Sequence, residues 1–223
     1  MTTFLAFPDI HDRAEPLKKM RHIIADVDAV LLAGDMTNGK PDNLQRVLNI
    51  IEAMNENIFA VCGNMDSEAM NMRLARDGIS VHRRHVMLDG LAILGCGGAL
   101  PYYGKYVFSE DELAGFLNDS LQGVSDNTPK ILICHQPPYD TKVDRVEDGT
   151  PVGSKAVREF IERVQPLICF SGHIHGATGI DSIGNTQLIN PGPLWQTSQY
   201  AYAEVENGEV VTLEIRQGEK LEI

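Results

Sequence analysis

The sequence predicts an α/β protein, and two observations lead to this prediction. Through the first 77 residues, short apolar runs alternate with segments whose apolar residues recur at helical spacing. Such a β-α-β-α-β-α order builds a largely parallel sheet with helices covering it. In addition, the apolar runs give way to Asp, Asn or His residues, which is expected where loops leave the carboxyl ends of parallel strands.

The first half of the chain contains three strand and helix pairs. Apolar runs at 4–7, 29–33 and 57–62 predict buried strands. A first helix is expected within 13–25, with Pro16 near its start, where proline is tolerated. A second follows Pro41, and a third covers roughly 67–77. The second helix has one apolar stripe, formed by Leu44, Val47, Leu48, Ile51 and Met54.

The second half is more varied. The segments 81–88 and 91–94, joined at Asp89-Gly90, predict a hairpin. Ser109 and Ser154 are expected to cap helices that reach about Asn118 and Val164. Further strands are predicted at 130–134, 167–170, 178–183, 186–189, 199–206 and 209–216, and long loops at 95–107 and 136–152. Because no repeat, low-complexity tract or linker interrupts the chain, we predict a single domain over residues 1–223.

Composition excludes several classes of protein. The formal net charge is -12 and no Lys/Arg run is present, so nucleic acid is not an expected partner. No apolar run approaches the ~20 residues of a membrane span, and the N-terminus does not have the pattern of a signal peptide. The four cysteines have no C-x-x-C spacing and are expected to be small buried residues, which fits a cytoplasmic, reducing setting.

Polar side chains that follow five buried runs carry the functional prediction. They share O and N donor atoms and include no thiolate, which suits Mn²⁺, Fe or Zn²⁺. Seven ligands are too many for one ion but suit two ions that share a bridging carboxylate. Taken singly, Asp35 could be a turn residue, Asn64 a helix cap and His135 a core histidine. The seven residues are Asp9, His11, Asp35, Asn64, His135, His173 and His175.

The order of these motifs resembles that of the calcineurin-like metallophosphoesterases. The motifs are Asp9-x-His11, Gly34-Asp35, Gly63-Asn64, His135 and Gly172-His173-x-His175. Asn190-Pro191-Gly192 is similar to a segment of small prokaryotic members. The run from His135-Gln136-Pro137-Pro138 to Ile161 is similar to a mainly archaeal and bacterial subgroup.

This resemblance implies a four-layer α/β/β/α sandwich with two mixed sheets and a metal-dependent phosphoester hydrolase. Asp9, His11 and His175 would hold one divalent ion (Mn, Fe, Zn or a mixture). Asn64, His135 and His173 would hold the second, and Asp35 would bridge both. A hydroxide shared by the two ions would be the nucleophile, so Asp35, Asn64 and His135 are the residues expected at the reacting centre.

One departure from the family pattern bears on the substrate. Most members have His after the Gly-Asn pair, where it is thought to protonate the leaving group, but this chain has Met65. Methionine cannot donate a proton, so we expect a phosphodiesterase rather than a monoesterase, acting on a small phosphoester. Candidate substrate-binding residues are Arg13, Tyr139 and Ser154.

Two alternatives stay open. One is a catalytically weak or silent metal-binding scaffold of the same fold that acts through surface contacts. The other is a phosphomonoesterase or protein phosphatase, which would need an open groove and a histidine at the position of Met65. The sequence leaves the natural substrate, the metal identity and the formation of a homo-oligomer undetermined.

Overall fold

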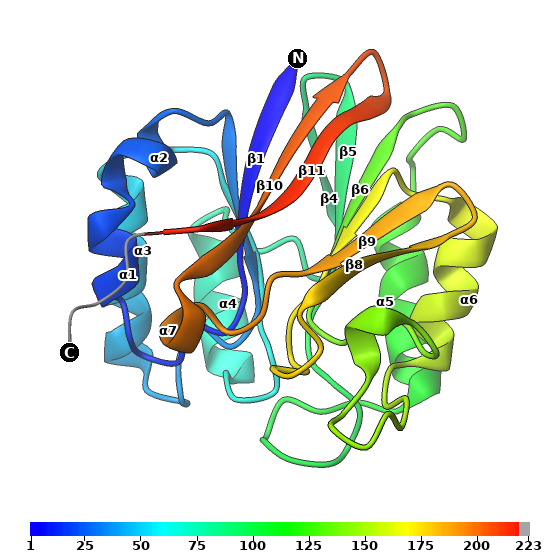
Figure 1. Cartoon of the computed structure of the whole chain (residues 1–223), viewed down its shortest axis with the longest axis horizontal. Helices are drawn as coiled ribbons and strands as arrows, with labels where there is room; N and C mark the ends of the chain where they lie inside the picture. Colours follow the sequence, from blue (N-terminus) through cyan, green and yellow to red (C-terminus); the bar gives the residue numbers. More distant parts are fainter. Residues whose placement is uncertain (219–223) are drawn as a thin grey trace.

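The computed structural model, which describes residues 1–218, has two β-sheets packed face to face between layers of helices (Figure 1). The inner faces of both sheets contribute to one apolar core, which includes Phe4, Phe59, Ile93, Ile131 and Phe170. Because both faces of the central strands are buried, their sequences are continuous apolar runs rather than alternating ones.

The first sheet has five strands in the order β11-β10-β1-β2-β3. Strands β1, β2 and β3 are parallel to one another, whereas β10 runs antiparallel to both β1 and β11. Its strands are β1 (Thr2–Phe7), β2 (Ala29–Ala33), β3 (Ile58–Val61), β10 (Gln199–Glu206) and β11 (Glu209–Gln217).

The second sheet has six strands in the order β4-β5-β6-β7-β9-β8. The four inner strands are parallel, and the outer strands β4 and β8 pair antiparallel with their neighbours. Its strands are β4 (His85–Leu88), β5 (Leu91–Cys96), β6 (Lys130–Cys134), β7 (Ile168–Phe170), β8 (Gly179–Ile183) and β9 (Thr186–Asn190).

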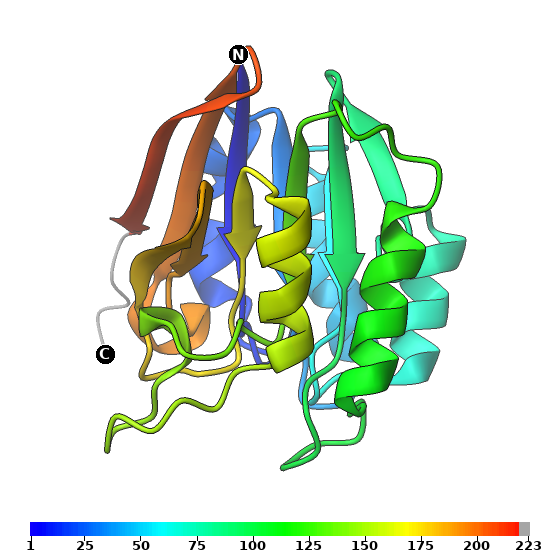
Figure 2. The ribbon, with the colours of Figure 1, turned by 90° about the vertical axis from the view of Figure 1, so that its right-hand side faces the viewer.

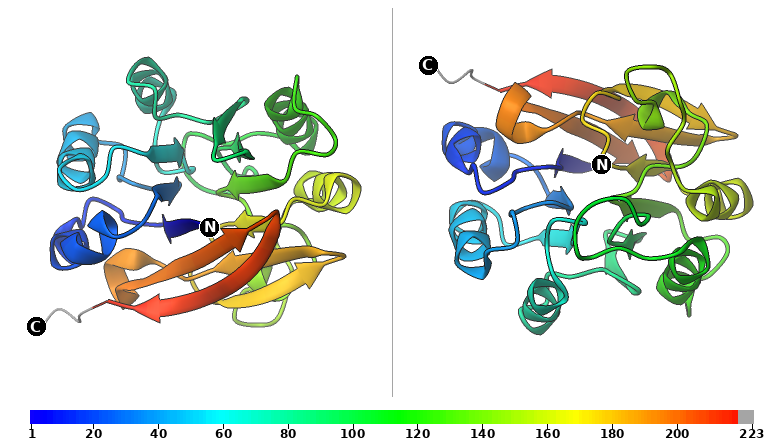
Figure 3. Two further views of the ribbon diagram at one scale, coloured as in Figure 1. Left: turned by 90° about the horizontal axis from the view of Figure 1, so that it is seen from above. Right: turned by 90° about the horizontal axis from the view of Figure 1, so that it is seen from below.

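Helices cover the outer faces of both sheets (Figure 3), which confirms the predicted four-layer fold. Helices α1 (Glu15–Lys19), α2 (Arg21–Ala25), α3 (Pro41–Glu52) and α4 (Glu68–Arg76) pack on the first sheet. Helices α5 (Glu110–Leu121) and α6 (Lys155–Val164) pack on the second. In α6, Ala156, Val157, Phe160 and Ile161 are buried, as a helical period predicts.

Some elements differ from the sequence prediction. The helix expected within 13–25 is divided at Met20, whose φ of -91° and ψ of 11° interrupt the α conformation. Of the strand expected at 81–88, only His85–Leu88 pairs as a strand; Ser80 and His82 make isolated bridges. The short helix α7 (Leu194–Thr197) and the 3-10 turn η1 (Lys142–Asp144) have no periodicity that would reveal them.

Two long loops, 97–108 and 135–153, leave the carboxyl-end edge of the second sheet and project from the lower end in Figure 2. The second loop is organised by the fully buried carboxylate of Asp144. Its oxygens accept backbone N–H bonds from Asp140, Thr141 and Gly153, each 2.9 Å long. One side chain therefore closes the loop on itself.

Among the described residues, no helix is both long and apolar enough to span a bilayer. The prediction of one domain over 1–223 includes residues 219–223, which lie outside the described residues, and it stays a prediction.

Removing the Asp144 carboxylate should destabilise the protein. Asp144→Ala removes the acceptor of three backbone N–H groups, of which those of Thr141 and Gly153 are buried, at about 1–3 kcal/mol for each group that water does not reach. We expect a loss of at least ~2 kcal/mol in the free energy of unfolding, measured by urea denaturation. Asp148→Ala is the control, because this exposed carboxylate of the same loop bonds locally to Thr150, two residues away. Equal stability of the two variants would contradict the assignment.

Candidate metal centre

The seven predicted ligands gather at the carboxyl ends of five strands drawn from both sheets. Asp9 and His11 follow β1, Asp35 follows β2 and Asn64 follows β3. His135 directly follows β6, and His173 and His175 follow β7. The site therefore spans the boundary between the two sheets, where loops from each can approach the other.

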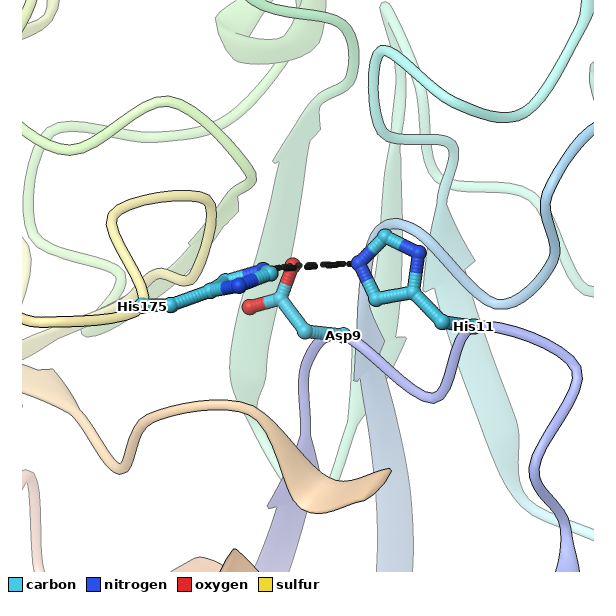
Figure 4. A group of neighbouring side chains, drawn as sticks. All are labelled: Asp9, His11 and His175. Atoms are coloured by element: carbon cyan, nitrogen blue, oxygen red, sulfur yellow. Dashed lines mark hydrogen bonds and ion pairs between the residues drawn. The ribbon is translucent and has the colours of Figure 1, made fainter. Parts of the chain in front are cut away.

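The first cluster consists of Asp9, His11 and His175 (Figure 4). Asp9 lies between the two imidazoles: its Oδ1 is 3.7 Å from His11 Nε2 and 3.3 Å from His175 Nε2. The two Nε2 atoms are 3.4 Å apart. Two imidazole nitrogens and the carboxylate oxygen that they face at these distances could supply three ligands of a tetrahedral or octahedral metal site.

The second cluster is joined to the first by Asp35. Asp35 Oδ2 lies 3.6 Å from His11 Nε2 and 3.6 Å from His135 Nε2. His135 Nε2 is also 3.0 Å from Asn64 Oδ1. One carboxylate oxygen is thus equidistant from a histidine of each cluster, and Asp9, Asp35 and His135 also lie close enough together to hold an ion.

His173 completes the arrangement from β7. Its ring centroid is 5.0 Å from that of His135, and its backbone N–H donates to Asp9 Oδ2 at 3.0 Å. All seven predicted ligands are therefore in one region.

Backbone strain concentrates at these ligands. Asp9, His11, Asp35 and His173 have φ values of 52°, 48°, 50° and 68°. Left-handed backbone is uncommon for residues other than glycine and costs about 1–3 kcal/mol where it occurs. Four such residues at one rim indicate a geometry that the surrounding structure imposes on the ligands.

Neighbouring groups fix which nitrogen of His135 and of His11 faces the centre. His135 Nδ1 is 2.8 Å from the carbonyl oxygen of Ala33, and this acceptor requires a proton on Nδ1. His11 Nδ1 pairs with Asn38 Oδ1 at 2.9 Å. The Asn38 amide is oriented in turn, because its Nδ2 donates to the carbonyl of His11 and to Asp12. Both Nε2 atoms are left to act as metal ligands.

The donor set fits divalent cations. Asp9 Oδ1 is buried and has no hydrogen-bond partner among the described residues, an arrangement that is costly unless a cation satisfies the oxygen. Gly63 leaves room for the Asp35 carboxylate, because a Cβ at position 63 would lie 2.2 Å from Asp35 Oδ1. Oxygen and imidazole ligands without thiolate suit Mn²⁺, Fe or Zn²⁺.

The pKa values of the site residues show that the buried carboxylates favour positive charge beside them. Burial alone would raise the pKa of Asp9, but His11 and His175 lower it well below its usual range. Burial raises the pKa of Asp35. Burial works against protonation of His11, yet Asp9 and Asp35 raise its pKa to about 9. Burial, with His135 nearby, lowers the pKa of His173 to about 3.

Asp66 connects two of the loops that carry predicted ligands. It is buried and accepts from Gly63 N at 2.9 Å and from the backbone and hydroxyl of Thr37, each at 3.0 Å. It thereby ties the loop that carries Asp35 to the loop that carries Asn64. Burial and the Asp35 charge raise its pKa to about 6.

The three candidate substrate-binding residues have different surroundings. Arg13 lines a cavity of about 180 Å³ together with His11 and His175. The Arg13 guanidinium stacks over the ring of Trp195, 4.5 Å from its centroid. Tyr139 is half-buried and lies outside the two cavities that border the metal centre.

Ser154 is fully buried, and its hydroxyl donates to the carboxylate of Glu110. The same carboxylate accepts from Lys155 N at 2.9 Å and Ala156 N at 3.0 Å. Glu110 thus occupies the start of α6, where a substrate phosphate would otherwise bind. The Ser154 hydroxyl is therefore already engaged within the fold.

Sequence reasoning missed Asn38 and Trp195. Asn38 stands three residues after Asp35, and that proximity was the only signal for it. Trp195 follows Asn190-Pro191-Gly192, and its backbone N–H donates to the carbonyl of Asp9 at 3.4 Å. Its indole Nε1 is buried without a hydrogen-bond partner among the described residues.

Comparison with known proteins places these residues in a family. The family model described as calcineurin-like phosphoesterase matches residues 2–177. An uncharacterized protein of Methanocaldococcus jannaschii is 29% identical over 193 residues, which are 83% of this chain and 85% of that protein.

Solved structures share the fold at low identity. The protein TT1561 of Thermus thermophilus superposes with a TM-score of 0.73 at 20% identity, covering 97% of this chain and 98% of that one. A putative 5'-nucleotidase of Staphylococcus aureus gives a TM-score of 0.60 at 15% identity, covering 97% of this chain and 53% of that one.

Metal binding should release a proton. In the metal-free protein His11 is protonated at neutral pH, because its pKa is about 9, and a cation requires the neutral imidazole. We expect the affinity for Mn²⁺ to rise about tenfold per pH unit between roughly pH 6.5 and 9, one proton being displaced. Calorimetry in buffers of different ionisation enthalpy measures the proton directly.

The exposed His22 provides the control, since His22→Gln should leave proton release unchanged. An affinity that does not vary with pH over this interval would contradict the prediction. The same shift should make the metal-free fold less stable as the pH rises from about 6.5 to 9, because the folded pKa lies above the unfolded one.

Proposed function

The chain belongs to the calcineurin-like phosphoesterase family, and from this membership we propose that it hydrolyses phosphodiesters with the help of two divalent cations. The observation that carries the proposal is the position of Asp35 Oδ2, 3.6 Å from the Nε2 atoms of both His11 and His135. A carboxylate so placed can bridge two ions.

The seven side chains divide into two ligand sets about Asp35. Asp9, His11 and His175 would hold one ion, and Asn64, His135 and His173 the other. Such a pair of cations supplies a nucleophile at neutral pH by lowering the pKa of water, and it offsets the charge that develops on phosphoryl oxygens.

Neighbouring residues orient the side chains of this centre through hydrogen bonds. Ala33 and Asn38 direct the Nε2 atoms of His135 and His11 inward. The backbone N–H of Met65 donates to Asp35 Oδ1 at 2.8 Å, which holds the carboxylate with Oδ2 toward the histidines. Because Asp35 is almost fully buried, little water competes for these contacts.

Two cavities beside the centre support a substrate with two ester substituents. The first is lined by His11, Arg13, His175 and Trp195, and the second, of about 330 Å³, by Met65, Tyr103 and Lys105 among others. Asn38 borders both cavities, so they adjoin at that residue. A phosphodiester has a group for each cavity, whereas a monoester has only one.

Arg13 is suited to hold a non-bridging oxygen of the substrate. Among residues 1–218, no carboxylate lies within ion-pair distance of its guanidinium, and stacking on Trp195 restrains its direction. A planar guanidinium whose N–H groups are free can donate to a phosphoryl oxygen in bidentate fashion.

Met65 lines the second cavity beside Asp35. Since it cannot protonate a leaving group, we expect faster hydrolysis of esters whose leaving groups are already weak bases, such as aryl or other acidic alcohols. For this reason we favour a phosphodiesterase over a protein phosphatase. The complete set of seven ligands, each near another, favours an enzyme over a silent scaffold.

The proposal is tested with bis-nitrophenyl phosphate and nitrophenyl phosphate in the presence of Mn²⁺. We expect kcat/KM to be higher for the diester, and Asp35→Asn to lower it by at least ~10²-fold, because the bridging charge is lost. Glu15→Gln, which alters an exposed carboxylate on α1, serves as the control. Metal bound at full stoichiometry without turnover of any ester would favour the scaffold instead.

Met65→His tests the role of the leaving group. A histidine there restores a proton donor, and we expect the rate on alkyl diesters to rise relative to aryl diesters by roughly 10²-fold, the low end of what a positioned general acid supplies. Met65→Leu should leave that ratio unchanged, because leucine is likewise no donor. An unaltered ratio in Met65→His would rule out this explanation of substrate preference.

A further inference from the structure

The loop 97–108 is bonded directly to the metal ligand Asn64. The side-chain Nδ2 of Asn64 donates to the carbonyl oxygen of Tyr103 at 2.9 Å. In return, the backbone N–H groups of Lys105 and Tyr106 donate to the carbonyl oxygen of Asn64 at 2.9 Å and 3.2 Å. Three hydrogen bonds therefore join the turn at 103–106 to one ligand from another strand.

The side-chain bond decides which end of the Asn64 amide faces the cation. An amide has one oxygen acceptor and one nitrogen donor. With Nδ2 held on the Tyr103 carbonyl, Oδ1 turns to the opposite side, where it lies 3.0 Å from His135 Nε2. In the flipped orientation the amide would present N–H groups to a cation, which would repel it.

Gly104 makes this approach feasible. Its φ is +97°, a conformation that side-chain-bearing residues rarely adopt. A Cβ at this position would lie 2.3 Å from the Asn64 carbonyl oxygen and 2.9 Å from Nδ2. The neighbour in conflict is backbone, so the loop itself would have to move away.

The tip of the loop is largely exposed. Tyr102 is 97% exposed and Tyr103 68% exposed, so neither side chain anchors the tip, whereas Tyr106 at the end of the turn is buried in the core. Residues 103–105 are therefore held between their contacts with Asn64 and the buried ring of Tyr106. The same turn forms a wall of the cavity that contains Met65.

We propose that loop 97–108 positions Asn64 as a ligand of the second cation and that Gly104 is the residue that permits this. The inference rests on the proposed two-metal function. Gly104 acts through Asn64 and does not touch the reacting atoms, so it is a positioning residue. Because outer-shell partners typically change metal affinity by about 10–100-fold, its loss should be measurable.

The test compares Gly104→Ala with Gly149→Ala by calorimetric titration with Mn²⁺. Gly149 is a matched control: it has φ of +84°, lies on the other loop of the same rim, and has nothing within 4 Å of an added Cβ. We expect Gly104→Ala to weaken one of the two Mn²⁺ sites by about 10–100-fold and to keep the other. Gly149→Ala, which carries comparable backbone strain, should retain both.

Several outcomes overturn the inference. If both variants bind two ions with wild-type affinity, loop 97–108 does not position Asn64, although the proposed function stands. Equal weakening of both sites in Gly104→Ala would indicate general disruption. A wild-type protein that binds one ion would remove the two-metal proposal and this inference with it.

A second measurement uses the unaltered chain, in case Gly104→Ala does not fold. Coupling between two sites is reciprocal, so filling the site that contains Asn64 should slow amide hydrogen exchange at Lys105 and Tyr106. We expect at least about tenfold slowing there on addition of Mn²⁺ at saturation, and no change at the control loop residue Gly149. Unchanged exchange at Lys105 and Tyr106 would contradict the inference.

Discussion

The burial of two carboxylates at one point is the constraint on which the rest of the structure depends. Asp9 and Asp35 are both shielded from water, and among the described residues neither has a Lys or Arg partner. Buried charge of one sign is expensive unless opposite charge compensates it. Imidazoles supply part of that compensation, and divalent cations would supply the remainder. The strained backbone at four ligands and the glycines packed against them follow from the need to bring these groups together.

The candidate ligands stand directly after strand ends and are oriented by hydrogen bonds, whereas the groups that would meet a substrate lie farther along the loops. Ala33 and Asn38 orient His135 and His11 through hydrogen bonds, and Asp66 ties together the loops that carry Asp35 and Asn64. Arg13 and Tyr103, in contrast, occupy turns that border the two cavities. In the proposed enzyme, this division would keep the metal chemistry constant while the shape of the cavities determined which esters enter.

That the seven candidate ligands would gather at one rim could be predicted from the sequence, because their positions follow from topology. Strand ends of a parallel sheet meet at one rim, so an Asp or His after each buried run could be placed without coordinates. Contacts between loops could not be predicted in this way. Glu110 caps α6 from a position 44 residues earlier in the sequence. Arg13 stacks on Trp195, which lies near the other end of the sequence. Such pairs depend on side-chain directions in irregular segments, where no periodicity exists. The break at Met20 was likewise hidden, since its apolar side chain fits the helical stripe.

The position of β1 has a consequence for how the protein is synthesised. This strand carries Asp9 and His11, yet one of its two neighbours is β10, which pairs Ala201–Val205 with Thr2–Ala6. A ribosome releases the N-terminal strand long before that neighbour exists. Until translation reaches residue 205, β1 has an unpaired edge, a template for association with other chains. This edge of β1 can therefore be covered only after all the strands that carry candidate ligands have been made.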